Sequence, residues 1–135
     1  AGYVSEFLLL DVTPLAIGIE VGDGLMDVLI PRNAKIPCSA NRLYTTQKDG
    51  QSGIRISVFQ GGFTEVAKNL KIAEFILKGI PAMPAGTPRI QVTFLMDSSG
   101  ILTVTALEKL TGISQSIQID SLLIDNPDVE QGAAV

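Results

Sequence analysis

The sequence predicts an all-β fold, a two-layer antiparallel β-sandwich, and three observations lead to it. Apolar and polar residues alternate at period two over several short stretches, as they do in strands with one buried face. Turn motifs containing glycine separate these stretches. The chain has 135 residues, 46% of them hydrophobic, which is enough for one domain with its own core. Consecutive amphipathic hairpins must bury their apolar faces against each other, which gives a sandwich.

The expected strands follow the alternating stretches in chain order. They are residues 17–21, 54–58, 90–96, 102–106 and 117–119. The turn motifs between the stretches supply a glycine where the backbone needs a positive φ. They are Asp23-Gly24, Asp49-Gly50, Ser99-Gly100 and Thr111-Gly112. Short strands joined by tight turns predict antiparallel hairpins.

The segment 64–78 does not fit this alternation. Its apolar residues fall at helical spacing with Lys and Glu between them, which predicts a helix among β neighbours. The prolines that follow predict an irregular loop over 80–88, because proline cannot donate a ladder hydrogen bond. The periodicity is lost from residue 122 onward, so 122–135 is expected to be a frayed tail.

Composition and charge argue against several classes of function. A net charge of −4 without a basic stretch argues against nucleic-acid binding. Histidine is absent, which removes the commonest general base and most transition-metal sites. The longest uninterrupted apolar run, 7–10, is far shorter than a membrane span. The single cysteine, Cys38, cannot form an internal disulfide, which favours a reducing, cytosol-like compartment.

No catalytic or metal-binding residue is expected. Lys48 and Lys109 lie beside turn motifs and are read as solvated charges. Asp97 and the serines after it match hairpin-turn chemistry. The glycine pair at 61–62 lacks the Lys-Ser/Thr of a phosphate-binding loop. The remaining apolar residues and the edges of the predicted strands suit the binding of an extended peptide.

Several motifs follow one another in a fixed order from residue 8 to residue 119. They are FLLLDVTPL at 7–15, GIE at 18–20, IPRN at 30–33, IP at 36–37, VFQGG at 58–62, GIP at 79–81, VTF at 92–94 and GILTVTA at 100–106. In this order they resemble the peptide-binding domain of the heat-shock protein 70 (DnaK) family. Three further stretches resemble its HscA branch, the specialised chaperones of iron–sulfur cluster assembly. They are TTQKDGQ at 45–51, GIPAMPAG at 79–86 and VTALEK at 104–109.

The resemblance implies a fold, a domain division and a peptide site. The fold is again a two-layer antiparallel sandwich, with a strand over 71–77 in place of the helix. The division is an interdomain linker at 1–13, the sandwich at 14–120 and a tail at 121–135. One set of implied site residues would line a deep pocket for an apolar side chain, typically leucine: Ile19, Leu25, Tyr44, Ile54, Ile56 and Ile90. A second set would lie along the peptide channel, namely Val21, Thr45, Gln47 and Gln51, and Gly22 would stand at an arch position over it.

From the residues alone, the isoleucines of this set could equally be plain core. Two positions depart from the family. In DnaK a methionine on one loop and a small residue on the other close an arch over the peptide, whereas here these positions are Gly22 and Gln47. HscA-type sequences carry a bulky aromatic residue at the position of Gln47. Because glycine has no side chain to reach across a channel, we expect faster peptide release than in a typical relative.

The resemblance also implies coupling to an ATPase domain that this chain does not include. The coupling positions are Leu9, Leu10, Asp11, Arg32, Asn33 and Pro37. The chain begins at Ala1 without a methionine or a leader, so it is expected to be a piece of a longer protein. By itself it would be no enzyme and would hold no cofactor, since ATP and Mg²⁺ would bind to the other domain.

The implied partners are extended apolar peptides or unfolded protein segments, an iron–sulfur scaffold protein and a J-domain co-chaperone. Neither nucleic acid nor a membrane is expected as a partner, and the expected location is the bacterial cytoplasm. Two alternatives remain at this point. One is a general folding chaperone with many clients, and the other is a structural sandwich used in protein assembly.

Overall fold

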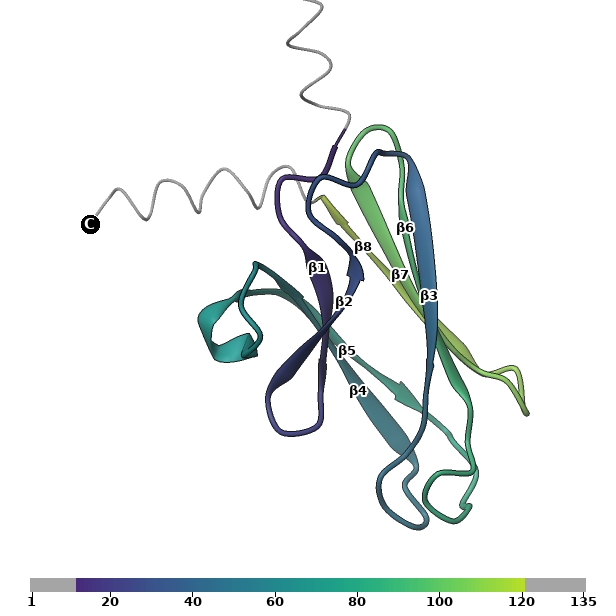
Figure 1. The fold of residues 1–135 in the computed structure, drawn as a ribbon. Coiled ribbons are helices and arrows are strands. Elements are labelled where there is room, and N and C mark those ends of the chain that lie inside the picture. Colours follow the sequence, from purple (N-terminus) through teal and green to yellow (C-terminus); the bar gives the residue numbers. More distant parts are fainter. Residues whose placement is uncertain (1–11, 121–135) are drawn as a thin grey trace, which may run out of the picture.

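A computed structural model describes residues 12–120, which form a β-sandwich of two four-stranded antiparallel sheets (Figure 1). The predicted fold class is therefore confirmed. The strands are β1 (Ile17–Val21), β2 (Leu25–Ile30), β3 (Cys38–Tyr44), β4 (Gly53–Gln60), β5 (Leu70–Lys78), β6 (Ile90–Met96), β7 (Ile101–Glu108) and β8 (Ser114–Asp120). The helical element is a single 3₁₀ turn, η1 (Val66–Lys68). Within residues 12–120, no helix is both long enough and apolar enough to cross a membrane.

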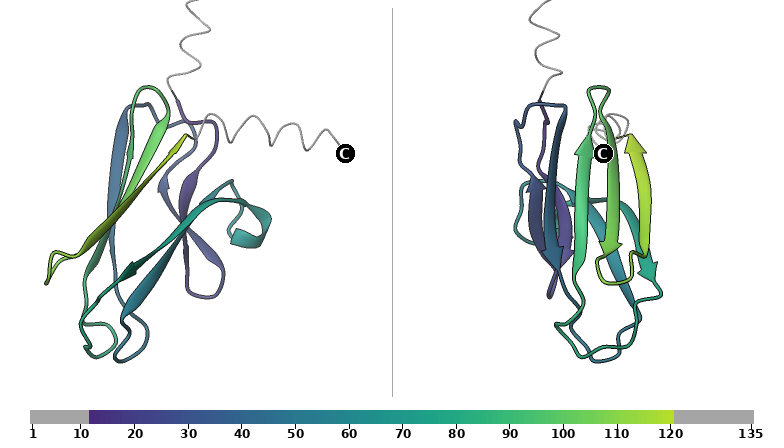
Figure 2. Two further views of the ribbon diagram at one scale, coloured as in Figure 1. Left: turned by 180° about the vertical axis from the view of Figure 1, so that it is seen from behind. Right: turned by 90° about the vertical axis from the view of Figure 1, so that its right-hand side faces the viewer.

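The strand order is β2-β1-β4-β5 in the first sheet and β3-β6-β7-β8 in the second. The views in Figure 2 show the two sheets facing each other, with the chain crossing from one to the other between β2 and β3, β3 and β4, and β5 and β6. The core lies between the sheets, as the alternation predicts: Ile90, Val92, Phe94 and Met96 are buried, whereas Leu95 between them is exposed.

The helix predicted for 64–78 is wrong, and the strand implied by the family resemblance is correct. β5 pairs with β4 along its whole length, from Leu70↔Gln60 to Lys78↔Gly53. Phe75 and Leu77 are buried and Ile76 is exposed, which is a period of two. The helical spacing arose by coincidence, because long-range pairing decides between two local patterns.

The four predicted glycine turns all have positive φ, but one of them does not close a hairpin. Gly24, Gly100 and Gly112 lie in the β1–β2, β6–β7 and β7–β8 hairpins. Gly50 instead lies between β3 and β4, which belong to different sheets. A turn motif reports only local geometry, so it does not show which strand comes to lie beside which.

Further predictions concern the proline-rich loop, the linker and the tail. Residues 80–88 form an irregular loop, as the prolines predict. The tail at 121–135 lies outside the described residues, and so do the linker positions Leu9, Leu10 and Asp11.

Candidate functional site

The first sheet forks between its two central strands. The β1–β4 ladder consists of Ile17↔Gln60, Gly18↔Phe59 and Ile19↔Val58. Beyond Ile19, β1 continues to pair with β2 on its other side, and β4 continues to pair with β5. Two strand segments, 20–21 and 53–57, therefore face each other across the fork with no ladder between them.

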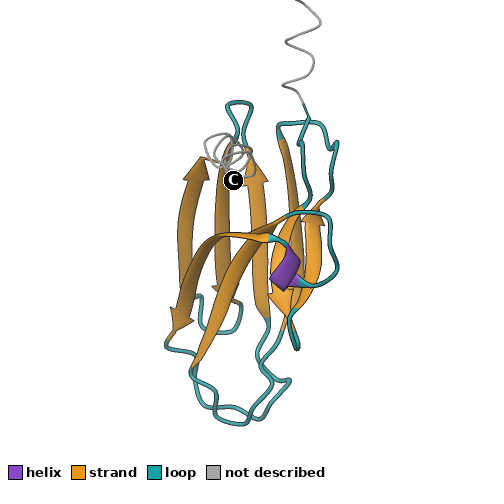
Figure 3. Cartoon of the chain, turned by 90° about the vertical axis from the view of Figure 1, so that its left-hand side faces the viewer, coloured by secondary structure: helices purple, strands orange, loops and turns teal. Residues whose placement is uncertain are grey.

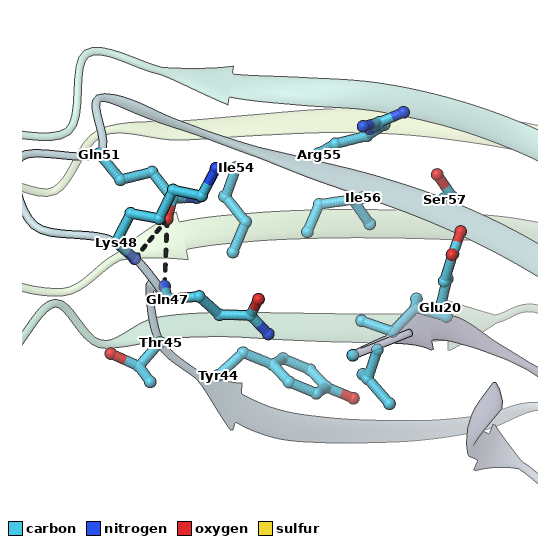
Figure 4. Close-up of a pocket in the computed structure, with 13 residues that line it drawn as sticks. Glu20, Tyr44, Thr45, Gln47, Lys48, Gln51, Ile54, Arg55, Ile56 and Ser57 are labelled. Atoms are coloured by element: carbon cyan, nitrogen blue, oxygen red, sulfur yellow. Dashed lines mark hydrogen bonds between the residues drawn. The ribbon is translucent and has the colours of Figure 1, made fainter. Parts of the chain in front are cut away.

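A cavity of about 770 Å³ occupies this fork and continues between the loops beside it (Figure 4). Its lining comes from the end of β1 and the turn after it, the start of β4, the end of β3 and the loop 45–52. The lining residues are Ile19, Glu20, Val21, Gly22, Tyr44, Thr45, Gln47, Lys48, Gln51, Ile54, Arg55, Ile56 and Ser57. We call this cavity the fork groove.

The floor of the fork groove is apolar. Ile19 and Ile56 are 3% and 2% exposed, because they also pack into the core between the sheets. Ile54 is only half-buried and offers more surface to the groove. The side chain of Gln47 extends over this floor toward the ring of Tyr44 (Figure 4). The groove is thus a partly apolar trough rather than the deep pocket that the resemblance implies.

Nine of the eleven predicted peptide-site residues line the fork groove, and two do not. Leu25 is 47% exposed and lies outside the lining, on β2 beyond the β1–β2 turn. Ile90 is 0% exposed and also outside it, because β6 lies one strand further into the second sheet than Tyr44. Ile90 instead belongs to the core between the sheets.

Four polar lining residues were not among the predicted site residues. They are Glu20, Lys48, Arg55 and Ser57. On a closed strand, Arg55 and Ser57 would face away from the residues of the floor. They reach the groove because it opens through the sheet at the fork, where both faces of β4 border it. Their position directly beside predicted site residues was the available clue.

Hydrogen bonds from Gln51 hold the loop 45–52 in shape. Its Oε1 accepts from the backbone N–H groups of Gln47 at 3.1 Å and Lys48 at 3.3 Å, and its Nε2 donates to the carbonyl oxygen of Gly53 at 2.9 Å. The loop 80–88 supports it from outside, since the backbone N–H of Ala85 donates to Asp49 Oδ1 at 2.8 Å. One groove wall is thus a braced loop.

Tyr44 connects the groove to the opposite sheet. Its hydroxyl donates to Asp27 Oδ2 at 2.5 Å, and Arg42 Nη1 donates to Asp27 Oδ1 at 2.8 Å. Burial raises the pKa of Tyr44 well above its ordinary value, and the bond to the Asp27 carboxylate raises it further. The hydroxyl therefore stays protonated and remains a donor.

The described coupling residues, Arg32, Asn33 and Pro37, lie together in the β2–β3 connection. This connection is at the end of the sandwich opposite the loop 45–52 (Figure 1). All three are exposed, and Asn33 has a φ of 66°. Thr13 attaches the start of the described chain to the same connection, because its hydroxyl donates to the carbonyl oxygen of Pro31 at 2.7 Å.

The groove side chains are suited to binding. The lining contains no histidine or cysteine, so it offers hydroxyl, amide, carboxylate and cationic groups around an apolar floor. Within residues 12–120, no three Cys, Asp or Glu side chains lie close enough together to hold a metal ion.

The fold and the fork groove define a β-sandwich protein with a partly apolar trough between two loops at one end. The family model described as Hsp70 protein matches residues 1–131, and the chain belongs to this family. It is 50% identical over 115 residues to proteins named "Chaperone protein HscA" from Pectobacterium carotovorum, Cronobacter sakazakii and Escherichia coli O139:H28. Each match covers 85% of this chain and 19% of the relative, so the chain spans about a fifth of their length.

Proposed function

We propose that this chain is the peptide-binding part of an HscA-type Hsp70 chaperone and that it holds an extended apolar polypeptide segment in the fork groove. The observation that carries the proposal is the end of the β1–β4 ladder at Ile19↔Val58, with a cavity of about 770 Å³ beyond it. Cavities of this size are common for ligand sites.

Backbone groups at the fork favour an extended ligand. The segment 53–57 of β4 pairs with β5 on one side and turns its other edge toward the groove. Sheet edges present N–H and C=O groups in a row, and an extended peptide satisfies such a row without requiring a fixed sequence. The conformation recognised would therefore be a strand, read mainly through its main chain.

The apolar floor supplies the preference for an apolar side chain. Burying one leucine contributes about 1.5 to 3 kcal/mol, and each backbone hydrogen bond adds about 1 kcal/mol. Ordering a flexible peptide opposes these terms. The expected upper limit of affinity is a dissociation constant in the micromolar range, which corresponds to a binding free energy of about 8 kcal/mol in magnitude.

The context of the longer protein belongs to the same proposal. A separate ATPase domain would control the affinity of the groove through the linker, which is coupling between two sites. The chain itself would hydrolyse no ATP. Its client would be an iron–sulfur scaffold protein, with a J-domain co-chaperone as helper, in the bacterial cytoplasm. These assignments rest on the likeness to the HscA relatives.

The test is a fluorescence-anisotropy titration of the 135-residue chain against a short labelled peptide with one central leucine. Saturable micromolar binding that an unlabelled copy displaces supports the proposal. Absence of saturable binding overturns it and favours the structural sandwich. Saturable binding of Mg²⁺-ATP by this chain would also overturn it, since the nucleotide site would then lie here.

A peptide array then separates the two kinds of chaperone. If the chain binds peptides with one motif and few others, the result supports a role on a single scaffold protein. Even binding to many unrelated apolar segments supports a general folding chaperone instead.

A further inference from the structure

A carboxylate points inward at the groove end of the sandwich. Asp27 on β2 lies directly opposite Ile19 on β1, and side chains of directly paired residues share a face of the sheet. Ile19 faces the core, so Asp27 also points between the two sheets. A carboxylate in such a position is costly unless polar partners satisfy it.

Both partners of this carboxylate come from the other sheet. Tyr44 and Arg42, two residues apart on β3, donate to its two oxygens at 2.5 Å and 2.8 Å. Hydrogen bonds to an ionised acceptor are stronger than neutral ones. We call Asp27, Arg42 and Tyr44 the clasp, because these residues tie β2 to β3 across the sandwich.

The clasp lies at the base of the two loops that border the fork groove. β2 begins directly after the turn that carries Gly22, and β3 ends at Tyr44, where the loop with Gln47 begins. Tyr44 is itself part of the groove lining. Above the clasp, Gly22 has no side chain, and a Cβ built there would meet no atom within 4 Å. The clasp is therefore placed to fix the separation of the two loops.

We propose that Asp27 and Tyr44 are positioning residues for the peptide site: their hydrogen bond holds the two loops together and limits how fast a peptide enters and leaves the groove. This inference rests on the proposed peptide-binding function. Entry and exit pass through the same opened state, so breaking the clasp lowers the barrier in both directions. The rates then rise together while the affinity stays nearly constant.

This kinetic pattern distinguishes a positioning role from a direct contact. A lost contact with the peptide raises mainly the release rate and weakens affinity by the same factor. A purely structural role lowers the free energy of unfolding and leaves both rates unchanged. The three possibilities therefore give different pairs of rate constants.

The test is Tyr44→Phe in the 135-residue chain, which removes the hydroxyl and keeps the ring in the groove wall. Stopped-flow fluorescence with a fluorescein-labelled peptide carrying one central leucine measures both rates. We expect both rate constants to rise roughly tenfold, which is the factor that one such hydrogen bond contributes. The dissociation constant should change by no more than about twofold. Ser116→Ala is the control, since it removes the hydroxyl bond to Thr105 in the second sheet, away from the groove, and should leave both rates unchanged.

A second variant covers the case in which Tyr44→Phe does not fold. Arg42→Gln breaks the ion pair from the exposed side of the clasp and should accelerate both rates in the same direction. Combining Tyr44→Phe with Asp27→Asn should add less than the sum of the single effects, because the two residues act through one bond.

The outcomes separate this inference from the proposed function. Unchanged rates in a folded Tyr44→Phe protein, or faster release alone with weaker affinity, overturn the inference and leave the peptide site in place. No binding of the labelled peptide by the unmodified chain overturns the proposed function and the clasp with it.

Discussion

The two ends of the β1–β4 pair use the same alternating sequence pattern for opposite purposes. At one end, Ile17–Ile19 pair with Val58–Gln60 and the sheet is closed. At the other end the same two strands diverge, and the fork groove lies between them. Isoleucines face inward at both ends. Alternation therefore predicts which side chains point inward, but it does not predict whether a neighbouring strand closes over them.

A covering segment packs on the outer side of the first sheet, outside the core. Phe59 and Val66 are buried, yet both lie outside the core between the sheets. The segment around η1 lies over the outer side of the first sheet, beside the β1–β2 hairpin (Figure 3). It reaches the forked half of β2 as well, because the backbone N–H of Met26, opposite Glu20, donates to the carbonyl oxygen of Thr64 at 2.8 Å and so protects the outer edge of β2. The inner edges differ, because β1 and β4 carry no ladder between them beyond Ile19↔Val58, where the fork groove lies.

The largest effect is expected from breaking the closed end with Gly18→Val. A Cβ at Gly18 would lie 2.1 Å from the backbone oxygen of Asp27, so the strands would have to move apart. We expect a loss of about 3 kcal/mol or more in the free energy of unfolding, measured by urea denaturation. The control is Gly62→Ala, where a Cβ meets nothing within 4 Å. Equal stability of the two variants would show that the tight approach of β2 to β1 is unimportant.

The next largest effect is expected from filling the forked end with Ile54→Phe. The larger ring would occupy the space over the floor, so peptide affinity should fall at least tenfold, about 1.4 kcal/mol, in the anisotropy titration. Stability should change little, because Ile54 is only half-buried. Ile76→Phe on the exposed face of β5 is the matched control and should bind peptide normally. Unchanged affinity in Ile54→Phe would remove Ile54 from the site.

A smaller effect is expected from bridging the fork with Gly22→Met. The added side chain has room, and it would restore an arch over the groove together with Gln47. Peptide release should slow several-fold, whereas the φ of 55° makes the variant less stable by about 1 kcal/mol. Gly22→Ala has the same backbone strain, but its side chain is too short to extend over the groove, so it should keep the original release rate. Equal release from both variants would argue against an arch at this position.

The smallest effect concerns a buried carboxylate near the groove end of the second sheet. Glu108 is 0% exposed and accepts hydrogen bonds from the backbone N–H groups of Leu110 at 3.0 Å and Thr111 at 2.8 Å. The bond from the Thr111 hydroxyl is the main cause that lowers the pKa of Glu108 below its ordinary 4.5. Its contribution to stability is therefore present above pH 4.5 and is lost as the pH falls through the lowered value.

Glu108→Gln should therefore flatten the loss of unfolding free energy below pH 4.5 in acid titrations followed by circular dichroism. Glu74→Gln is the comparison, because the pKa of Glu74 is also lowered, chiefly by its bond with Lys71, on the exposed face of β5. Solvent screens that pair, so a smaller change is expected. An acid profile unaltered by Glu108→Gln would mean that this carboxylate titrates alike in the folded and unfolded chain.

The sequence alone was sufficient to predict those features that depend on local backbone geometry. Period-two alternation placed β6 and β7 and their buried faces, because strand geometry alone sends successive side chains to opposite sides. Local spacing was misleading for β5, because its apolar residues also fit a helical period. Only pairing with β4 fixed this segment as a strand. For the site, the family motifs brought nine of eleven residues to one groove, and they could not reveal that Ile90 is fully buried in the core between the sheets.

By itself, the sequence determined an all-β chain with one core, positive-φ turns at the predicted glycines, and membership of the Hsp70 family. Only the tertiary structure decided that β1 and β4 part after Ile19↔Val58, that Arg55 and Ser57 border the gap, and that Asp27 meets Tyr44. The physical reason is that each of these depends on residues far apart in the chain. Side-chain direction is set within a strand, whereas pairing, divergence and cross-sheet contacts are set by packing between strands.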